Sequence, residues 1–175
     1  MKFIHLSDLH IGKRVNEFSM IEDQKYILRQ VIELVQKERP DGVLLAGDIY
    51  DKPVPSAEAV QVFDEFLNGL AEQKVSIFII SGNHDSPERL NYASSFMEKH
   101  QIYISVMPPQ KADEYLKKVV LADDYGLVNI YLLPFTKPGY VRPLFSDRDI
   151  SDYETAVRAI LERESIDISQ RNILV

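Results

Sequence analysis

The stretch Gly42-Val43-Leu44-Leu45-Ala46-Gly47-Asp48-Ile49-Tyr50-Asp51 decides the fold that this sequence predicts. Its first half is a short apolar run, and its second half turns to glycine and two carboxylates. An apolar run that ends in small or polar residues is typical of a buried parallel strand. Because glycine lets the backbone turn sharply and approach a ligand closely, Gly47 favours a binding loop at the end of this strand.

Two further stretches repeat the arrangement on either side. The apolar run Lys2–Leu6 leads to Asp8-Leu9-His10, and the run Val75–Ile80 leads to Gly82-Asn83-His84-Asp85. Open α/β sheets place their ligands at the carboxyl ends of parallel strands, so we expect the three polar clusters to meet at one edge. Carboxylate, imidazole and amide oxygen together suit a divalent metal ion such as manganese, iron or zinc.

Helical patterns alternate with these strands. The first helix carries the stripe Leu28, Val31, Ile32 and Val35 and stops at Pro40-Asp41-Gly42. The second is capped by Ser56 and carries Ala59, Phe63, Phe66, Leu67 and Leu70. The third begins at Ser86-Pro87 and carries Leu90, Ala93, Phe96 and Met97. This alternation predicts an α/β fold, with a central sheet flanked by helices and a site at the carboxyl ends of the strands.

The second half of the chain has a different character. Lys117–Leu121 and Leu127–Leu133 predict a β-hairpin around Asp123-Asp124-Tyr125-Gly126. A final helix is expected to open with the capping box Ser151-Asp152-Tyr153-Glu154. The sequence then enters another apolar run, Asn172–Val175, which we interpret as a core strand.

Composition sets limits on function. The 175 residues fit one domain, and the absence of cysteine excludes disulfides and thiolate metal sites. No apolar stretch approaches the roughly 20 residues of a membrane span, and the N-terminus does not read as a signal peptide, so we expect a cytoplasmic protein. The formal net charge of −7 opposes a free-standing DNA-binding protein, because neutralising phosphates requires basic side chains.

The three polar clusters resemble the first three sequence motifs of the calcineurin-like metallophosphoesterases, namely Asp8-x-His10, Gly47-Asp48-x-x-Asp51 and Gly82-Asn83-His84-Asp85. The resemblance implies an α/β sandwich that holds two divalent metal ions. It implies that Asp8 and His10 bind one ion, that Asp48 bridges both, and that Asn83 binds the second. A bridging carboxylate suits this arrangement, because two neighbouring cations need a shared anionic ligand.

His84 and Asp51 are the catalytic residues that the resemblance implies. His84 matches the histidine that contacts the phosphate, and Asp51 matches a residue that orients this histidine in several members. The implied reaction is in-line hydrolysis at a two-metal site, with a neutral histidine donating a proton to the departing alkoxide. Asp85 has two interpretations, as a part of its motif or as a structural cap for the third helix.

Within this superfamily the sequence is similar to the SbcD family of DNA exonuclease subunits, in Ser7–Lys13, Asn83–Leu90 and Leu132–Phe135. Bacterial members often have tryptophan where Leu9 stands. The similarity implies a manganese-dependent exo- or endonuclease subunit of DNA repair and recombination, with magnesium or another divalent ion as the alternative metal. It also implies a homodimer and an SbcC-type ATPase partner. This partner would supply the DNA-holding surface that an acidic chain lacks.

One departure from the family concerns the end of the sequence. The family completes its metal site with three later histidines, but no histidine follows Ile173-Leu174-Val175. We therefore expect residues 1–175 to be the N-terminal part of the nuclease domain, truncated in a core strand and lacking the capping and partner-binding regions. With an incomplete metal shell, the chain should bind metal weakly and hydrolyse little.

Alternatives remain open for the function and for several residues. The same site could belong to a phosphatase or a small-nucleotide phosphodiesterase, or the domain could be a non-catalytic dimerising scaffold. Lys13, Arg14 and Arg89 are candidate contacts to phosphate or DNA, or else solvated loop residues. Val60 lies outside the apolar stripe of its helix, which indicates a dimer interface or a broad core face.

Overall fold

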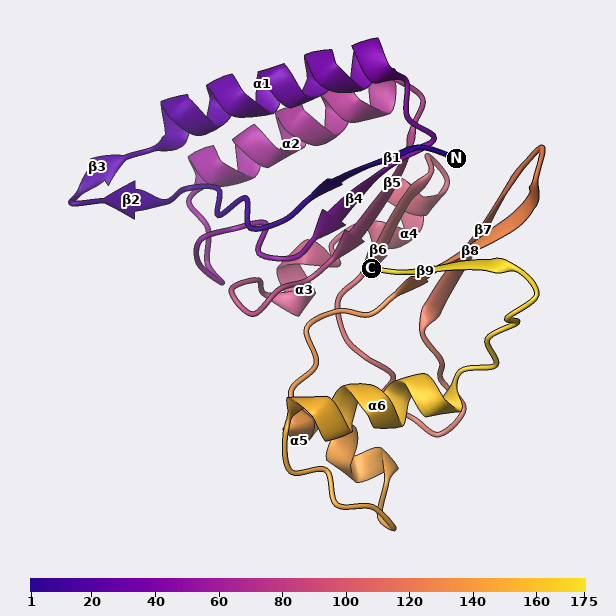
Figure 1. The fold of residues 1–175 in the computed structure, drawn as a ribbon. Coiled ribbons are helices and arrows are strands. Elements are labelled where there is room, and N and C mark those ends of the chain that lie inside the picture. Colours follow the sequence, from indigo (N-terminus) through magenta and orange to yellow (C-terminus); the bar gives the residue numbers. More distant parts are fainter. The chain divides into compact units, whose positions relative to one another are not determined.

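The computed structural model describes residues 1–175, which form two compact units, Met1–Ile104 and Ser105–Val175 (Figure 1). None of the helices has the length and apolar character that crossing a bilayer requires. The first unit contains the predicted metal-binding clusters, and the second contains the predicted hairpin and final helix.

A four-stranded sheet forms the centre of the first unit, in the order β1-β4-β5-β6. Its strands are β1 (Phe3–Leu6), β4 (Gly42–Ala46), β5 (Ser76–Ile80) and β6 (Ile102–Ser105). β4 pairs in parallel with both β1 and β5, which confirms the three strands and their common direction. The middle strands are almost entirely buried because helices and neighbouring strands cover them, as their continuous apolar sequences indicate. β6 has no counterpart among the predicted strands.

Two long helices pack against each other in this unit, α1 (Ile21–Glu38) and α2 (Ala57–Glu72) (Figure 1). Ser56 caps α2 as predicted, because its hydroxyl oxygen accepts the N–H of Ala59 at 3.1 Å. The helices approach closely at Gly69, where an added Cβ would lie 2.5 Å from the side chain of Ile32.

The predicted third helix is instead two short helices, α3 (Pro87–Leu90) and α4 (Ser94–Glu98). Ser86 caps α3 as predicted, but Ala93 adopts a left-handed conformation with φ 58° and interrupts the helix. The apolar spacing fits a helix, yet the break turns Phe96 outward, where it is 64% exposed. A left-handed alanine has no signature in the hydrophobic pattern, so the continuous helix was a wrong prediction.

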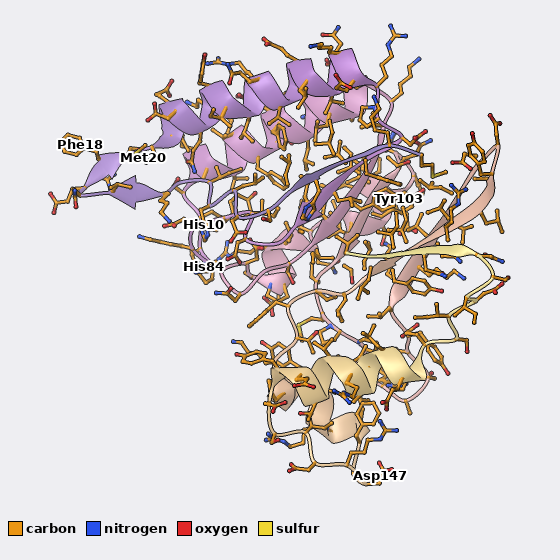
Figure 2. All side chains as sticks on the ribbon, viewed as in Figure 1. His10, Phe18, Met20, His84, Tyr103 and Asp147 are labelled. Atoms are coloured by element: carbon orange, nitrogen blue, oxygen red, sulfur yellow. The ribbon has the colours of Figure 1, made fainter.

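A small antiparallel ribbon, which was not predicted, connects β1 to α1. It consists of β2 (Arg14–Val15) and β3 (Phe18–Ser19). Asn16 and Glu17 both have positive φ, as the tight turn of a two-residue hairpin requires. The ribbon projects from the sheet edge where β1 and β4 end, with Phe18 on the strand past its turn (Figure 2).

The second unit contains a three-stranded sheet in the order β7-β8-β9. β7 (Lys117–Asp123) and β8 (Gly126–Leu132) form the predicted hairpin, and β9 (Arg171–Leu174) pairs with β8 in parallel. The helical elements are α5 (Pro138–Val141), the 3-10 helix η1 (Arg142–Leu144) and α6 (Tyr153–Arg163). The core of this unit comprises Leu116, Tyr131, Val141, Phe145, Ile150, Ala156, Ala159 and Ile160.

The capping box of α6 lies one residue later than predicted. The Asp152 carboxylate accepts the N–H of Thr155 at 2.8 Å, and the Thr155 hydroxyl accepts the N–H of Asp152 at 3.1 Å. Ser151 and Glu154 match the usual sequence pattern, but aspartate caps at least as well as serine. The sequence allows two overlapping capping boxes, and the structure forms the one between Asp152 and Thr155.

Candidate metal centre

His10, Asp48 and His84 meet at the carboxyl edge of the first sheet. Their candidate ligand atoms all lie within 4.8 Å of one another, although they come from three separate loops. Nε2 of His10 lies 3.7 Å from Oδ2 of Asp48 and 3.8 Å from Oδ1 of Asp8. The rings of His10 and His84 stand nearly perpendicular, with centroids 4.8 Å apart. Figure 2 labels both residues on the first unit. The three polar clusters therefore meet at one edge of the sheet, as their positions after the strands predict.

Glycines allow the second and third loops to come together. Gly47 has φ 86°, and a Cβ there would lie 2.9 Å from the Cα of Gly82. A Cβ on Gly82 would lie only 2.0 Å from Oδ1 of Asp48. A side chain at Gly82 would therefore occupy the place of the carboxylate, which explains a glycine at this position.

Three of the acidic and imidazole residues have unusual backbone conformations. Asp8, His10 and Asp48 have φ values of 55°, 43° and 50°, in the left-handed region that costs a non-glycine residue roughly 1 kcal/mol or more. Backbone hydrogen bonds hold the first loop against the second, from the N–H of Asp8 to Gly47 and from the N–H of His10 to Asp48. The strain lies in the segments that aim the candidate ligands.

Gln24 on α1 holds the first loop, which carries His10, through three side-chain hydrogen bonds to the loop backbone. Its Nε2 donates to the carbonyls of Leu9 at 3.0 Å and His10 at 2.8 Å, and its Oε1 accepts the N–H of Gly12 at 3.0 Å. This residue was not predicted from the sequence. A signal exists, because Gln24 lies one helical turn before Leu28 on the face that α1 buries.

Asp85 joins the second and third loops. Its buried carboxylate accepts the N–H groups of Ile49 at 3.2 Å, Tyr50 at 3.0 Å and Gly82 at 2.8 Å. The hypothesis of a cap for α3 is wrong, because Ser86 has that role and Asp85 ties two loops together instead. Burial, with the Asp85 charge nearby, raises the pKa of Tyr50 to about 12, so this phenol stays neutral.

The main chain orients His84. Its Nδ1 lies 2.9 Å from the carbonyl oxygen of Asp51, and its own N–H donates to Oδ1 of Asp48 at 2.9 Å. Since a carbonyl only accepts, Nδ1 carries the proton and Nε2 is left for an ion or a substrate. Asp51 thus contacts His84 through its backbone, while its carboxylate lies 3.7 Å from Nδ1 of His10.

The chemistry of these groups fits a divalent cation. The separations of 3.7 and 3.8 Å around Nε2 of His10 are too long for hydrogen bonds. Two ligand atoms that each lie about 2.1 Å from an ion are at most about 4.2 Å apart, so an ion can sit between them. Nδ1 of His10 is buried without a hydrogen-bond partner, which leaves the ring oriented by its loop rather than by a competing acceptor.

The other candidate residues lie around this cluster. Asn83 is exposed in the loop just before His84, and Lys13 and Arg14 lead from the first loop into the ribbon. Arg89 and Val60 instead line one apolar groove between α2 and α3. The structure therefore groups Arg89 with the candidate dimer residue rather than with the three-residue cluster.

Comparison with known proteins agrees with this geometry. The family model described as calcineurin-like phosphoesterase matches residues 1–167. The chain is 39% identical over 178 residues to the SbcD subunit of the SbcCD nuclease from Staphylococcus epidermidis and 36% identical to the one from Staphylococcus saprophyticus. All of the chain is covered, but it spans about half the length of these relatives, 46% and 45%. The resemblance to this family is confirmed, and the chain belongs to the calcineurin-like phosphoesterase family.

Proposed function

We propose that the full natural chain carrying this sequence is a metal-dependent DNA nuclease subunit. It would hydrolyse phosphodiesters with two divalent ions, and manganese is the metal that we propose. The meeting of His10, Asp48 and His84 within 4.8 Å at the strand ends carries this proposal. The names of the two staphylococcal relatives, each a nuclease subunit, support a nucleic acid over other phosphodiesters, and DNA is the nucleic acid that we propose. DNA repair and recombination in the cytoplasm is the corresponding role.

Four side chains are assigned to the ions. Asp8 and His10 would hold one ion, Asp48 would be shared by both, and Asn83 would offer its amide oxygen to the second. When bound, the ions supply positive charge that stabilises the entering and leaving oxygens of an in-line displacement. The separations of 3.7 and 3.8 Å from His10 to the two carboxylates support the first assignment.

His84 contacts the phosphate and handles the proton of the leaving group. Because the Asp51 carbonyl holds Nδ1–H, neutral His84 has a lone pair at Nε2 and accepts a hydrogen bond there. It can donate from Nε2 only when both ring nitrogens are protonated. In this tautomer, proton donation from Nε2 to the leaving group would require the doubly protonated ring.

Cleavage of end-labelled linear DNA by the full natural chain tests the proposal, beside an Asp48→Ala variant. We expect cleavage that requires both manganese and Asp48. Hydrolysis of a small generic phosphodiester that depends on Asp48, without any DNA cleavage, would contradict the DNA assignment. It would favour the phosphatase or small-nucleotide phosphodiesterase alternative.

An SbcC-type ATPase is the proposed partner, and the net charge of −7 supports it. An acidic chain needs another surface to hold DNA, since neutralised phosphates supply most of non-specific affinity. The names of the two relatives make each of them a subunit of a larger nuclease. Co-purification of the full natural chain with such an ATPase would support this partnership. As a control, the chain should not co-purify with the ATPase of an unrelated repair system.

A homodimer through the groove between α2 and α3 is the second proposed assembly. The groove has a volume of about 480 Å³, and exposed Tyr92 and half-exposed Val60 flank it. A carboxylate placed at Val60 would be buried without a partner in such an interface. Sedimentation of Val60→Asp should therefore give monomers where the unchanged protein gives dimers, and equal behaviour of the two would contradict the interface.

A further inference from the structure

A cleft of about 360 Å³ opens beside the metal centre. It lies between the β2–β3 ribbon and the segment that leads from Asp51 to α2. The residues that define its chemistry are Arg14, Ser19, Asp51, Lys52, Val54 and Ser56. Because Asp51 both lines the cleft and contacts His84, a group bound in the cleft would be a close neighbour of the reacting phosphate.

Two cationic side chains face this cleft, Arg14 and Lys52, and both residues are exposed. Two acidic residues also line it. Glu58 pairs with Nζ of Lys25 at 3.4 Å, whereas the Asp51 carboxylate lies 3.7 Å from Nδ1 of His10, too far for a hydrogen bond. Two cations therefore face one carboxylate that has no lysine or arginine partner, so the lining is positive by one charge in a chain that is acidic as a whole.

Two hydroxyl groups add neutral donors to the cleft. Oγ of Ser19 accepts the N–H of Ile21 at 3.4 Å, and Oγ of Ser56 accepts the N–H of Ala59 at 3.1 Å. In both contacts the oxygen accepts, so each hydroxyl hydrogen is still available to donate. Val54 is 66% exposed on the same wall and offers apolar surface for a sugar ring.

We propose that this cleft binds the phosphodiester group next to the scissile one, so that Arg14 and Lys52 hold the substrate strand in register with the metal centre. The inference rests on the proposed nuclease function. Cations and hydroxyl donors around a volume of this size suit one sugar-phosphate unit. A substrate with a single phosphodiester fills the metal centre but does not reach the cleft.

The test compares two substrates in the full natural chain with manganese, a DNA oligonucleotide and bis(p-nitrophenyl) phosphate. Lys52→Gln removes one cation without removing a hydrogen bond of the fold, and Arg14→Gln removes the other, along with its bond to the Glu17 carbonyl. Lys37→Gln is the matched control, because it makes the same change in the last turn of α1. The measurements are KM and kcat for each substrate, and the salt dependence of KM for DNA.

We expect Lys52→Gln and Arg14→Gln each to raise KM for DNA about tenfold and to lower the salt slope by about 1. Hydrolysis of the small diester should match the Lys37→Gln control. If both variants cleave DNA with the KM and salt slope of the control, the cleft proposal is wrong but the nuclease function stands. An equal loss of activity on DNA and on the small diester would also overturn the cleft proposal. If the unchanged protein hydrolyses the small diester but not DNA, the nuclease function fails and the cleft proposal fails with it.

Discussion

Gln24 is the side chain through which α1 controls the loop of His10. Gln24→Leu keeps the size of the side chain but leaves two carbonyls and one N–H of that loop without their partner. Since residues that orient a ligand typically matter about 10- to 100-fold in metal affinity, we expect a loss of about that size by calorimetric manganese titration. Gln30→Leu is the control, because Gln30 bonds only the exposed Tyr26 hydroxyl. Equal affinities in the two variants would refute a positioning role for Gln24.

Gly82 presents a second, purely steric test. Gly82→Ala would put a methyl group 2.0 Å from Oδ1 of Asp48, so that the carboxylate or the loop must move. We expect the variant to lose manganese binding and to unfold at a lower temperature. Gly139→Ala is the control, because a methyl group there meets nothing within 4 Å. Manganese titration and thermal unfolding check both, and unchanged metal affinity in Gly82→Ala would contradict the packing described.

The β7–β8–β9 sheet carries a pH-sensitive ion pair between strands. Arg171 on β9 bonds Asp123 on β7, and this guanidinium holds the pKa of the Asp123 carboxyl well below its ordinary value of 3.8. A lowered pKa means that the pair contributes its full stability above about pH 4 and loses it as the pH falls toward the lowered value. Asp123→Asn should therefore flatten the decline of unfolding free energy in acid, measured by urea titration between about pH 2 and about pH 6. An identical decline in the variant would count against this pair.

The elements that the sequence predicted are those in which local pattern and packing agree. β4 and β5 are buried on both faces, so their apolar runs are continuous and unambiguous. The ribbon of Arg14–Ser19 depends on two positive φ values, and α3 and α4 are separated by one left-handed alanine. Such conformations depend on backbone packing around a few residues, and a periodicity of apolar residues carries no trace of them.

The residues of the candidate site also fall into those that the local sequence pattern predicts and those that depend on the folded chain. Asp8, His10, Asp48 and His84 stand directly after predicted strands, so the topology alone brings them to one edge. The contacts of Gln24 and Asp85 join segments far apart in sequence, and only the folded chain reveals them. Asp51 illustrates a third case, because its residue was predicted but the contact to His84 uses the carbonyl group that every residue has.

The charge of the chain leads to a prediction about DNA binding. With a net charge of −7, these 175 residues alone should bind duplex DNA no more tightly than the roughly 10⁻⁴ to 10⁻⁶ M typical of non-specific binding at physiological salt. Fluorescence anisotropy with a labelled duplex at low and physiological salt measures this. A nanomolar Kd at physiological salt would mean that the chain holds DNA by itself and needs no partner for that purpose.

The loops of the metal centre are distant in sequence, and that distance has a thermodynamic consequence. His84 and Asp48 are 36 residues apart, yet an ion shared by their loops would tie them together as a crosslink does. Such an ion favours only the folded chain, because an unfolded chain does not hold its ligands together. At a free-ion concentration about 100 times Kd the folded state gains about 2.7 kcal/mol, so a chelator would shift the melting curve to lower temperature. A bound divalent ion would then stabilise the folded state of this protein independently of any part in catalysis.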